Sequence, residues 1–329
     1  MSSESDESIQ IYNVKEGKHS KTLLSKKYGV KLAKFSHNST SVFFASTKVD
    51  GKHELYQNHF QTDHWPVVDT IRYLSTHDNS FIRYFRGHEG PVTCLAPNPG
   101  EDTFLSCSTD NTVRLWDINS ENCAGKLNLA LPFLAAFDPS ASVIAIASEA
   151  AQTILLYDFR QYDKEPFATF DLLTCSSQVR KHGACKGWNK LEFSNDGKSL
   201  LVGTSGGGHF LLDAFDGTLK CWLARPNKNN GPARSAPGDQ KTADLPLAES
   251  SGDAMFTPDG RYVISGQRGE NVLVWDTMSS AKDLYLAPIH EFERKSEAAV
   301  MAYNPRYNVF ASADKEVLLW LPDQHAMSS

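Results

Sequence analysis

The sequence predicts an all-β fold, a seven-bladed β-propeller whose first blade is incomplete. A short turn motif precedes a hydrophobic strand at six places: an aromatic residue or proline, then a polar residue, then Pro, Asn or His. A second strand follows each time and ends on a bulky residue. These bulky residues recur with a period of about 40 residues, which is typical of propeller blades built from four short strands.

Each element can be placed from these signals. The six turns are Phe35-Ser36-His37, Pro97-Asn98-Pro99, Phe137-Asp138-Pro139, Phe193-Ser194-Asn195, Phe256-Thr257-Pro258 and Tyr303-Asn304-Pro305. The strands predicted after them are Val42–Ser46, Phe104–Ser108, Val143–Ala147, Ser199–Gly203, Tyr262–Ser265 and Val309–Ser312. The bulky anchors are Tyr73, Trp116, Tyr157, Leu212, Trp275 and Trp320, and Tyr12 is a seventh anchor without a preceding turn. Because turn residues alternate with short β-branched and aromatic runs, seven blades are expected.

The segment Arg83–Asp117 carries the best-defined blade. It begins near Gly87-His88 and ends on Trp116-Asp117. These GH and WD dipeptides are the signature of a WD repeat, so the propeller is expected to be of the WD-repeat kind.

Four polar or aromatic residues of this blade could suggest a hydrolase: His88, Ser106, Asp110 and Trp116. A nucleophilic serine needs an exposed hydroxyl and an oxyanion site, and the sequence has no G-x-S-x-G elbow. We therefore expect these residues to form a buried structural hydrogen-bond network, in which Ser108 could take the place of Ser106.

The first and last blades of the chain match the repeat pattern only in part. The innermost strand of the first blade is missing before Tyr12, and so is the N-terminal strand that usually completes the last blade. Open strand edges invite unwanted pairing. We expect that the natural protein begins upstream and that Met1 is an internal methionine.

Three insertions are expected within a single propeller domain spanning residues 1–329. Residues 51–69 hold no repeat feature, and are either a long surface loop or translated intron sequence. Residues 163–187 are mixed in character and include a predicted outer strand at Pro166–Phe170. Residues 225–250 are rich in Pro, Gly, Asn and charge, which predicts a disordered loop.

Composition narrows the possible partners and cofactors. The net charge of −6 over 329 residues gives no electrostatic basis for sequence-specific nucleic-acid binding. No apolar run reaches the roughly 18 residues of a membrane helix, so no membrane partner is expected. The six cysteines form no CxxC pair, and are interpreted as reduced, packed thiols. His182 and Cys185 with Cys175 fit no common zinc spacing.

No motif in the chain predicts catalysis. There is no P-loop, HExxH motif or dinucleotide fingerprint, and Gly206-Gly207-Gly208 is followed by no Lys-Ser/Thr pair. We expect no cofactor and no metal. A scaffold or adaptor is the function that such a propeller predicts.

Five segments resemble one particular family: Ser25–Val30, Ile71–His88, Asp102–Asp117, Trp188–Ser205 and Leu211–Gly217. They are similar to the WD-repeat subunit of the COMPASS histone H3 lysine-4 methyltransferase complex. In fungi, the same subunit also belongs to the cleavage-and-polyadenylation factor. The similarity covers nearly all the chain outside the insertions. The chain departs from the family in its incomplete first blade and in residues 51–69, which puts any partner surface on blades one and two in doubt.

The resemblance implies a nuclear, non-catalytic subunit. Its implied partners are the methyltransferase catalytic subunit and other COMPASS subunits, together with cleavage-and-polyadenylation factor subunits. It implies a role in coupling methylation, mRNA 3′-end processing and transcription termination to RNA polymerase II, whose phosphorylated tail is a further candidate partner. Candidate contact residues in the loops before blades and between middle strands are Arg86, Asn111, Lys190, Arg268 and Lys315.

A second adaptor function remains open. Tyr157-Asp158-Phe159-Arg160 resembles the WDxR motif of substrate receptors for cullin ubiquitin ligases, although its first position differs. Tyr157 is also explained as a blade anchor and Asp158 as a turn residue.

Overall fold

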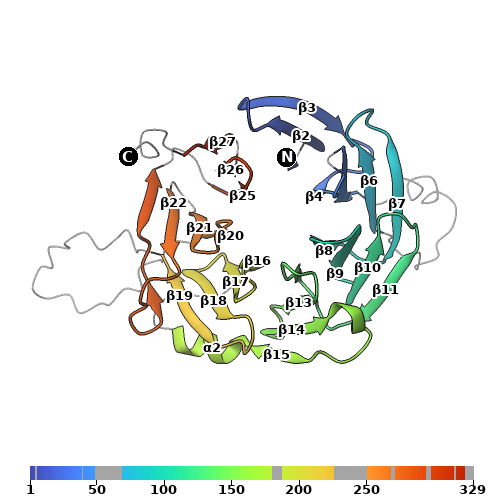
Figure 1. The fold of residues 1–329 in the computed structure, drawn as a ribbon. Coiled ribbons are helices and arrows are strands. Elements are labelled where there is room, and N and C mark those ends of the chain that lie inside the picture. The colour runs from blue at the N-terminus through green and yellow to red at the C-terminus, as the bar shows by residue number, and fades with distance from the viewer. Residues whose placement is uncertain are drawn as a thin grey trace, which may run out of the picture. The chain divides into compact units, whose positions relative to one another are not determined.

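Short antiparallel strands make up nearly all the regular structure in the computed structural model (Figure 1). The structure describes residues 1–3, 6–38, 40–48, 69–179, 187–225, 250–267, 271–293, 298–314 and 316–322. Two compact units divide the chain, Met1–Asp171 and Leu172–Ser329.

The first unit holds four antiparallel sheets. Its strands are β1 (Ser2–Ser3), β2 (Ser8–Asn13), β3 (Lys18–Leu24), β4 (Lys31–Phe35), β5 (Ser41–Ala45), β6 (Asp69–Ser75), β7 (Phe81–His88), β8 (Val92–Pro97), β9 (Thr103–Ser108), β10 (Thr112–Asp117), β11 (Cys123–Asn128), β12 (Leu134–Phe137), β13 (Val143–Ser148), β14 (Thr153–Asp158) and β15 (Ala168–Asp171). The sheets contain β1–β3, β4–β7, β8–β11 and β12–β15, so strands adjacent in the chain pair within each blade.

The second unit begins with a helix and holds three sheets. Its elements are α2 (Leu172–Val179), β16 (Trp188–Phe193), β17 (Ser199–Thr204), β18 (Gly208–Asp213), β19 (Leu219–Ala224), β20 (Ser250–Phe256), β21 (Tyr262–Gln267), β22 (Asn271–Asp276), β23 (Tyr285–Leu286), β24 (His290–Glu293), β25 (Val300–Asn304), β26 (Val309–Ala313) and β27 (Val317–Trp320). The sheets are β16–β19 with β23, β20–β22 with β24, and β25–β27.

The prediction of an all-β propeller is confirmed. Each of the six strands predicted after a turn motif is present to within one or two residues, as β5, β9, β13, β17, β21 and β26. The described strands form seven sheets, but fewer than seven are complete blades because β1–β3 and β25–β27 hold three strands each. The outer strand predicted at Pro166–Phe170 is β15, which pairs with β14.

Two elements were missed. Helix α2 buries Leu172, Cys175 and Val179, whose spacing of three and four residues is that of one helix face. Strand β23 adds a parallel fifth strand to its sheet, pairing Trp222 with Tyr285. Residues 51–68 lie outside the described residues, so the predictions for the insertion 51–69 stay predictions.

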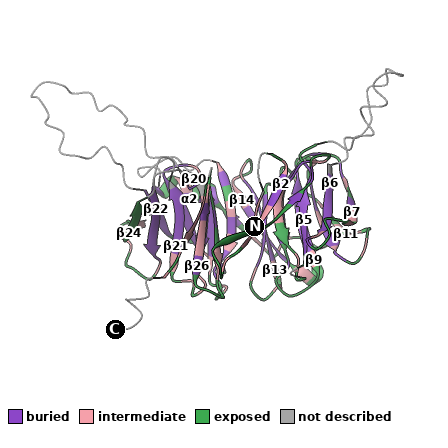
Figure 2. Ribbon diagram, turned by 90° about the horizontal axis from the view of Figure 1, so that it is seen from above, coloured by how far each residue is buried: buried purple, intermediate pink, exposed green. Residues whose placement is uncertain are grey.

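The core lies between successive sheets of each unit. In the first unit Phe43 of β5 stacks on Phe104 of β9 at 4.6 Å between ring centroids, and Phe85 of β7 meets Phe104 edge-on at 5.1 Å. These side chains are at most 1% exposed, and burying each stabilises the fold by about 1.5–3 kcal/mol. Strands such as β5, β21 and β22 are accordingly coloured as buried along most of their length in Figure 2.

Candidate functional site

A buried hydrogen-bond chain joins β7 to the two middle strands of the next blade. The His88 imidazole contacts the Asp110 carboxylate through Nδ1 at 2.9 Å and the Ser106 hydroxyl through Nε2 at 2.6 Å. The Trp116 indole N–H donates to the same Ser106 oxygen at 2.8 Å. The structure thus brings together all four residues of the predicted network. Ser108 does not take the place of Ser106, because its hydroxyl donates to the Gly90 carbonyl at 2.8 Å and accepts from the Asp110 backbone N–H at 3.2 Å.

The direction of each hydrogen bond in this network follows from which groups can donate and which can accept. Trp116 can only donate and an ionised Asp110 can only accept. With a neutral imidazole, Ser106 donates to His88 Nε2 and His88 Nδ1–H donates to Asp110. Ser106 is fully buried, so its hydroxyl is closed to any substrate. The arrangement is that of a structural clamp.

Asp110 is held in its ionised form. Burial acts against ionisation, but hydrogen bonds from Thr112, His88 and the backbone N–H of Glu89 outweigh it and lower the Asp110 pKa to about 2. The Asp110 carboxylate therefore stays ionised and accepts the hydrogen bonds of this network at all physiological pH values.

A second buried cluster in the other unit was missed by sequence reasoning. The Arg225 guanidinium donates to Ser265 Oγ at 2.6 Å and to the Gly266 carbonyl at 2.8 Å. His209 Nε2 lies 2.8 Å from the same Ser265 oxygen. Trp275 pairs with Val263, two residues before Ser265, as Trp116 pairs with Phe104, two residues before Ser106. The register could therefore have identified Ser265 from the position of the tryptophan anchor.

Arg225 occupies the place that His88 holds in the first cluster. It directly follows β19, the fourth strand of the preceding sheet, and is 4% exposed. Burial lowers the Arg225 pKa to about 9, and burial together with Arg225 lowers the His209 pKa well below its usual value. His209 is therefore neutral. The predicted insertion 225–250 begins at this ordered residue, and residues 226–249 lie outside the described residues.

The five predicted contact residues differ in exposure and contacts, and only three of them are described. Arg86 is exposed on β7, and its guanidinium lies 5.8 Å from the Tyr84 ring centroid. Asn111 is exposed in a turn with φ of 62°, where its side chain accepts a hydrogen bond from the Leu131 N–H at 2.9 Å. Lys190 is half-buried and lies 3.6 Å from Asp253. The other two, Arg268 and Lys315, lie outside the described residues.

Arg86 ends a ladder of alternating cations and aromatic rings, which sequence reasoning did not predict. Lys27 lies 5.1 Å from the Tyr28 ring, and Arg72 lies 3.3 Å from the Tyr28 ring and 5.2 Å from the Tyr84 ring. Arg72 and Tyr84 are directly opposite in the β6–β7 register, and Arg86 follows Tyr84 by two residues on the same strand face. Arg72 is fully buried, and a desolvated cation–π contact is worth about 2 kcal/mol.

The turn before β4 places Tyr28 in this ladder. Gly29 adopts φ of +69°, and a Cβ there would meet Thr47 Oγ1 at 1.6 Å. Only glycine fits, since both the conformation and the space exclude a side chain. The exposed ends, Lys27 and Arg86, have no carboxylate partner among the described residues, so the ladder presents positive charge.

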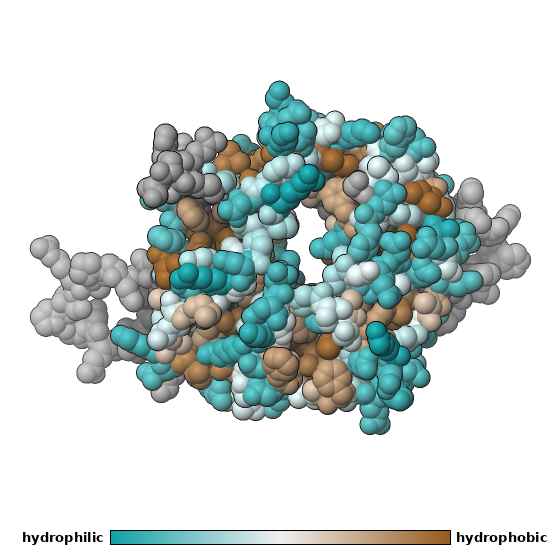
Figure 3. Space-filling view, viewed as in Figure 1, coloured by the Kyte–Doolittle hydropathy of each residue, from teal (hydrophilic) through white to brown (hydrophobic). Residues whose placement is uncertain are grey.

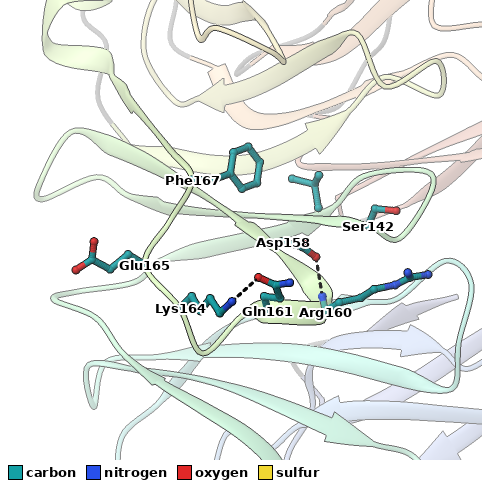
Figure 4. Close-up of a pocket in the computed structure, with 8 residues that line it drawn as sticks. Ser142, Asp158, Arg160, Gln161, Lys164, Glu165 and Phe167 are labelled. Atoms are coloured by element: carbon teal, nitrogen blue, oxygen red, sulfur yellow. Dashed lines mark hydrogen bonds between the residues drawn. The ribbon is translucent and has the colours of Figure 1, made fainter.

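Two residues of the segment Tyr157–Arg160, Asp158 and Arg160, line an open cavity of about 640 Å³ (Figure 4). Asp158 accepts a hydrogen bond from the Arg160 N–H at 2.9 Å and caps a short 3₁₀ turn, η1 (Phe159–Gln161). Lys164 donates to Gln161 Oε1 at 2.8 Å. Tyr157 is buried as a blade anchor, so its ring is not displayed to a partner.

Within the described ranges, no group of three His, Cys, Asp or Glu side chains is arranged to hold a metal ion. Among the helices of the described ranges, none is long and apolar enough to cross a membrane. The five described cysteines are free thiols; Cys185 and His182 fall outside the described ranges.

The blade geometry defines a class of protein. Residues 79–117 match the family described as WD domain, G-beta repeat, and this segment contains the His88–Trp116 network. A chain in the crystal structure of the mitotic checkpoint complex matches with a TM-score of 0.66 and 12% identity, covering 96% of this chain and 82% of that one. This second match shows the shared fold alone. The protein is a WD-repeat β-propeller.

Relatives that align with nearly the whole chain identify its family within the WD-repeat propellers. The chain is 37% identical over 318 residues to WD repeat-containing protein 82 of Drosophila melanogaster, covering 96% of this chain and 84% of that protein. It is 31% identical over 329 residues to COMPASS component SWD2 of Saccharomyces cerevisiae, covering 98% and 87%. The chain belongs to the WD-repeat family that contains these two proteins. The family resemblance noted in the sequence is confirmed.

Proposed function

We propose that the protein is a non-catalytic scaffold subunit of a COMPASS-type histone H3 lysine-4 methyltransferase complex in the nucleus. The observation that carries this proposal is the similarity to COMPASS component SWD2 over 98% of the chain. Rigid blades with buried polar clamps and exposed loops suit a protein that holds several partners at once. The Ser106 hydroxyl serves the clamp, which supports a structural role for this network.

We further propose that the same subunit contacts cleavage-and-polyadenylation factor subunits and the phosphorylated tail of RNA polymerase II. This would link methylation to mRNA 3′-end processing and transcription termination. The cation–aromatic ladder supports the phosphate part of the proposal. Arginine matches phosphate oxygens bidentately, and Lys27 and Arg86 are exposed at its two ends. Asn111 and Lys190 are the other described contact candidates, although the 3.6 Å approach to Asp253 makes Lys190 less available.

The first experiment is a tagged purification of the protein from native extract, identified by mass spectrometry. We expect methyltransferase-complex subunits together with polyadenylation-factor subunits. Recovery of a cullin and its adaptor without either set would overturn the proposal. It would favour the substrate-receptor function, for which Asp158 and Arg160 beside the 640 Å³ cavity are the residues to mutate.

The ladder is tested with one charge reversal and a matched control. Arg86→Glu should weaken binding of a phosphorylated polymerase-tail peptide at least about tenfold, because it replaces an attraction by a repulsion. Arg306→Glu is the control, since Arg306 is also exposed and lies 5.6 Å from the Tyr307 ring. Equal loss in both variants, or no loss in either, would remove Arg86 from the contact surface.

A further inference from the structure

A repeated turn displays one side chain after the third strand of four blades. The aspartate at the end of that strand accepts a hydrogen bond from the backbone N–H two residues later, at 2.8–3.0 Å. The pairs are Asp117 with Asn119, Asp158 with Arg160, Asp213 with Phe215 and Asp276 with Met278. This hydrogen bond fixes the turn, and all four displayed side chains are exposed.

The second unit places large apolar side chains at both of its displayed positions. Phe215 is 76% exposed and Met278 is 79% exposed, while the first unit has the polar Asn119 and Arg160 there. Isolated exposed apolar residues are common, but these two repeat on neighbouring blades at equivalent positions. Figure 3 shows that hydrophilic side chains predominate on the face in view, with apolar side chains in smaller groups.

Hydrogen bonds make the surface between the two side chains continuous. The Ala214 N–H, next to Phe215, donates to the Lys198 carbonyl at 3.1 Å. Asn195, in the same turn as Lys198, donates from its side chain to the Pro258 carbonyl of the next blade at 3.1 Å. The Thr277 N–H, next to Met278, donates to the Arg261 carbonyl at 2.8 Å. The floor between Phe215 and Met278 is therefore built by the turns at the ends of β16 and β20.

The charges on this floor leave a negative excess. Asp213 pairs with Lys220 at 3.1 Å and Asp276 pairs with Arg261 at 2.9 Å. Asp196 lies near Lys198, whose charge helps to lower the Asp196 pKa after hydrogen bonds from Ser194 and the Lys198 N–H. Two exposed carboxylates remain, Asp216 beside Phe215 and Asp259 in the turn of the next blade. Neither forms a close ion pair among the described residues, although the charge of Asp259, after the hydrogen bond and charge of Asp276, helps to raise the pKa of Arg261; each caps its own turn.

We propose that Phe215 and Met278, together with Asp216 and Asp259, form a docking site for a segment of a partner protein. The segment carries two apolar side chains, each with a lysine or arginine beside it. The apolar side chains cover Phe215 and Met278, and the basic side chains pair with the two exposed carboxylates. The site is independent of the cation–aromatic ladder. The ladder lies in the other unit and is positively charged, so it suits an anionic ligand.

The probe is a panel of fluorescein-labelled synthetic peptides with two Leu-Arg pairs separated by Gly-Ser spacers of about three to eight residues. Matched peptides replace leucine by serine or arginine by glutamate. Binding to the full chain is followed by fluorescence anisotropy. We expect at least one spacer length to bind more tightly than both matched peptides.

The variants assign that binding to the site. The double variant Phe215→Ala with Met278→Ala should weaken it at least about tenfold, since buried aromatic anchors dominate such contacts. Asp216→Asn with Asp259→Asn should weaken it severalfold at low salt and less at high salt. Asn119→Ala, at the equivalent position of a first-unit blade, should leave binding unchanged.

Three results would overturn the proposal. The first is a panel in which no peptide exceeds its serine counterpart. The second is undiminished binding by the Phe215/Met278 double variant. The third is equal weakening by Asn119→Ala. Because Phe215 and Met278 are exposed, their substitution should leave the melting temperature unchanged, so a loss of binding is not a loss of fold.

Discussion

Replacing Ser106 by alanine should destabilise the first unit by about 2–4 kcal/mol. Ser106 Oγ is the junction of the clamp, with Trp116 Nε1 at 2.8 Å and His88 Nε2 at 2.6 Å. The alanine variant leaves the indole N–H of Trp116, which is fully buried, without an acceptor. An orphaned buried donor costs about 1–3 kcal/mol, and the lost bond to His88 adds about 1 kcal/mol.

Calorimetry and urea unfolding measure this effect. For a unit of this size, each 1 kcal/mol lowers the melting temperature by about 2–4 °C. The control is a double-mutant cycle with Trp116→Phe, which removes the indole N–H donor; the cost of its smaller ring occurs in both arms of the cycle and cancels in the coupling energy. If the two groups interact as the geometry requires, the double variant loses at least about 1 kcal/mol less than the sum of the single variants. Strict additivity, or a Ser106→Ala cost below about 0.5 kcal/mol, would refute the reasoning.

Two further predictions concern titratable groups. Because the pKa of Asp110 falls to about 2 in the fold from 3.8, its contribution is fully present above about pH 4 and is lost as the pH falls toward 2. The stability difference between wild type and Asp110→Asn should therefore shrink by about 1 kcal/mol between pH 5 and pH 3 in urea titrations; a constant difference would contradict this. Burial raises the Cys221 pKa to about 12, against a smaller opposing effect of Lys220, and burial raises the Cys107 pKa well above its usual value. Neither thiol should react with iodoacetamide at pH 8 until urea is added, as read by peptide mass spectrometry; rapid alkylation of the native protein would show that the thiols are accessible.

The blades could be located from the sequence because residues close together in the chain signal their turns and strands. A turn such as Phe256-Thr257-Pro258 and an anchor such as Trp275 are signalled by residues adjacent in the chain, and both flank strands found where they were expected. The His88 clamp was predictable for the same reason, because its members fall at fixed places in one repeat. Family membership was also readable from segments such as Trp188–Ser205, and full-length relatives confirm it.

Tertiary structure decided what depends on distant segments. Arg225 looked like the start of a polar insertion, yet the β18–β19 hairpin carries it to Ser265, some 40 residues away in the chain, where it is buried. Arg72 reads as a surface charge, but strand pairing with β7 and the turn at Gly29 enclose it between Tyr28 and Tyr84. The same holds for Phe215 and Met278, which are ordinary apolar residues in the sequence and become a surface pair only through the packing of neighbouring blades. Sequence patterns report the period and polarity of one strand, whereas burial of a charge or exposure of an apolar ring is set by which strands become neighbours.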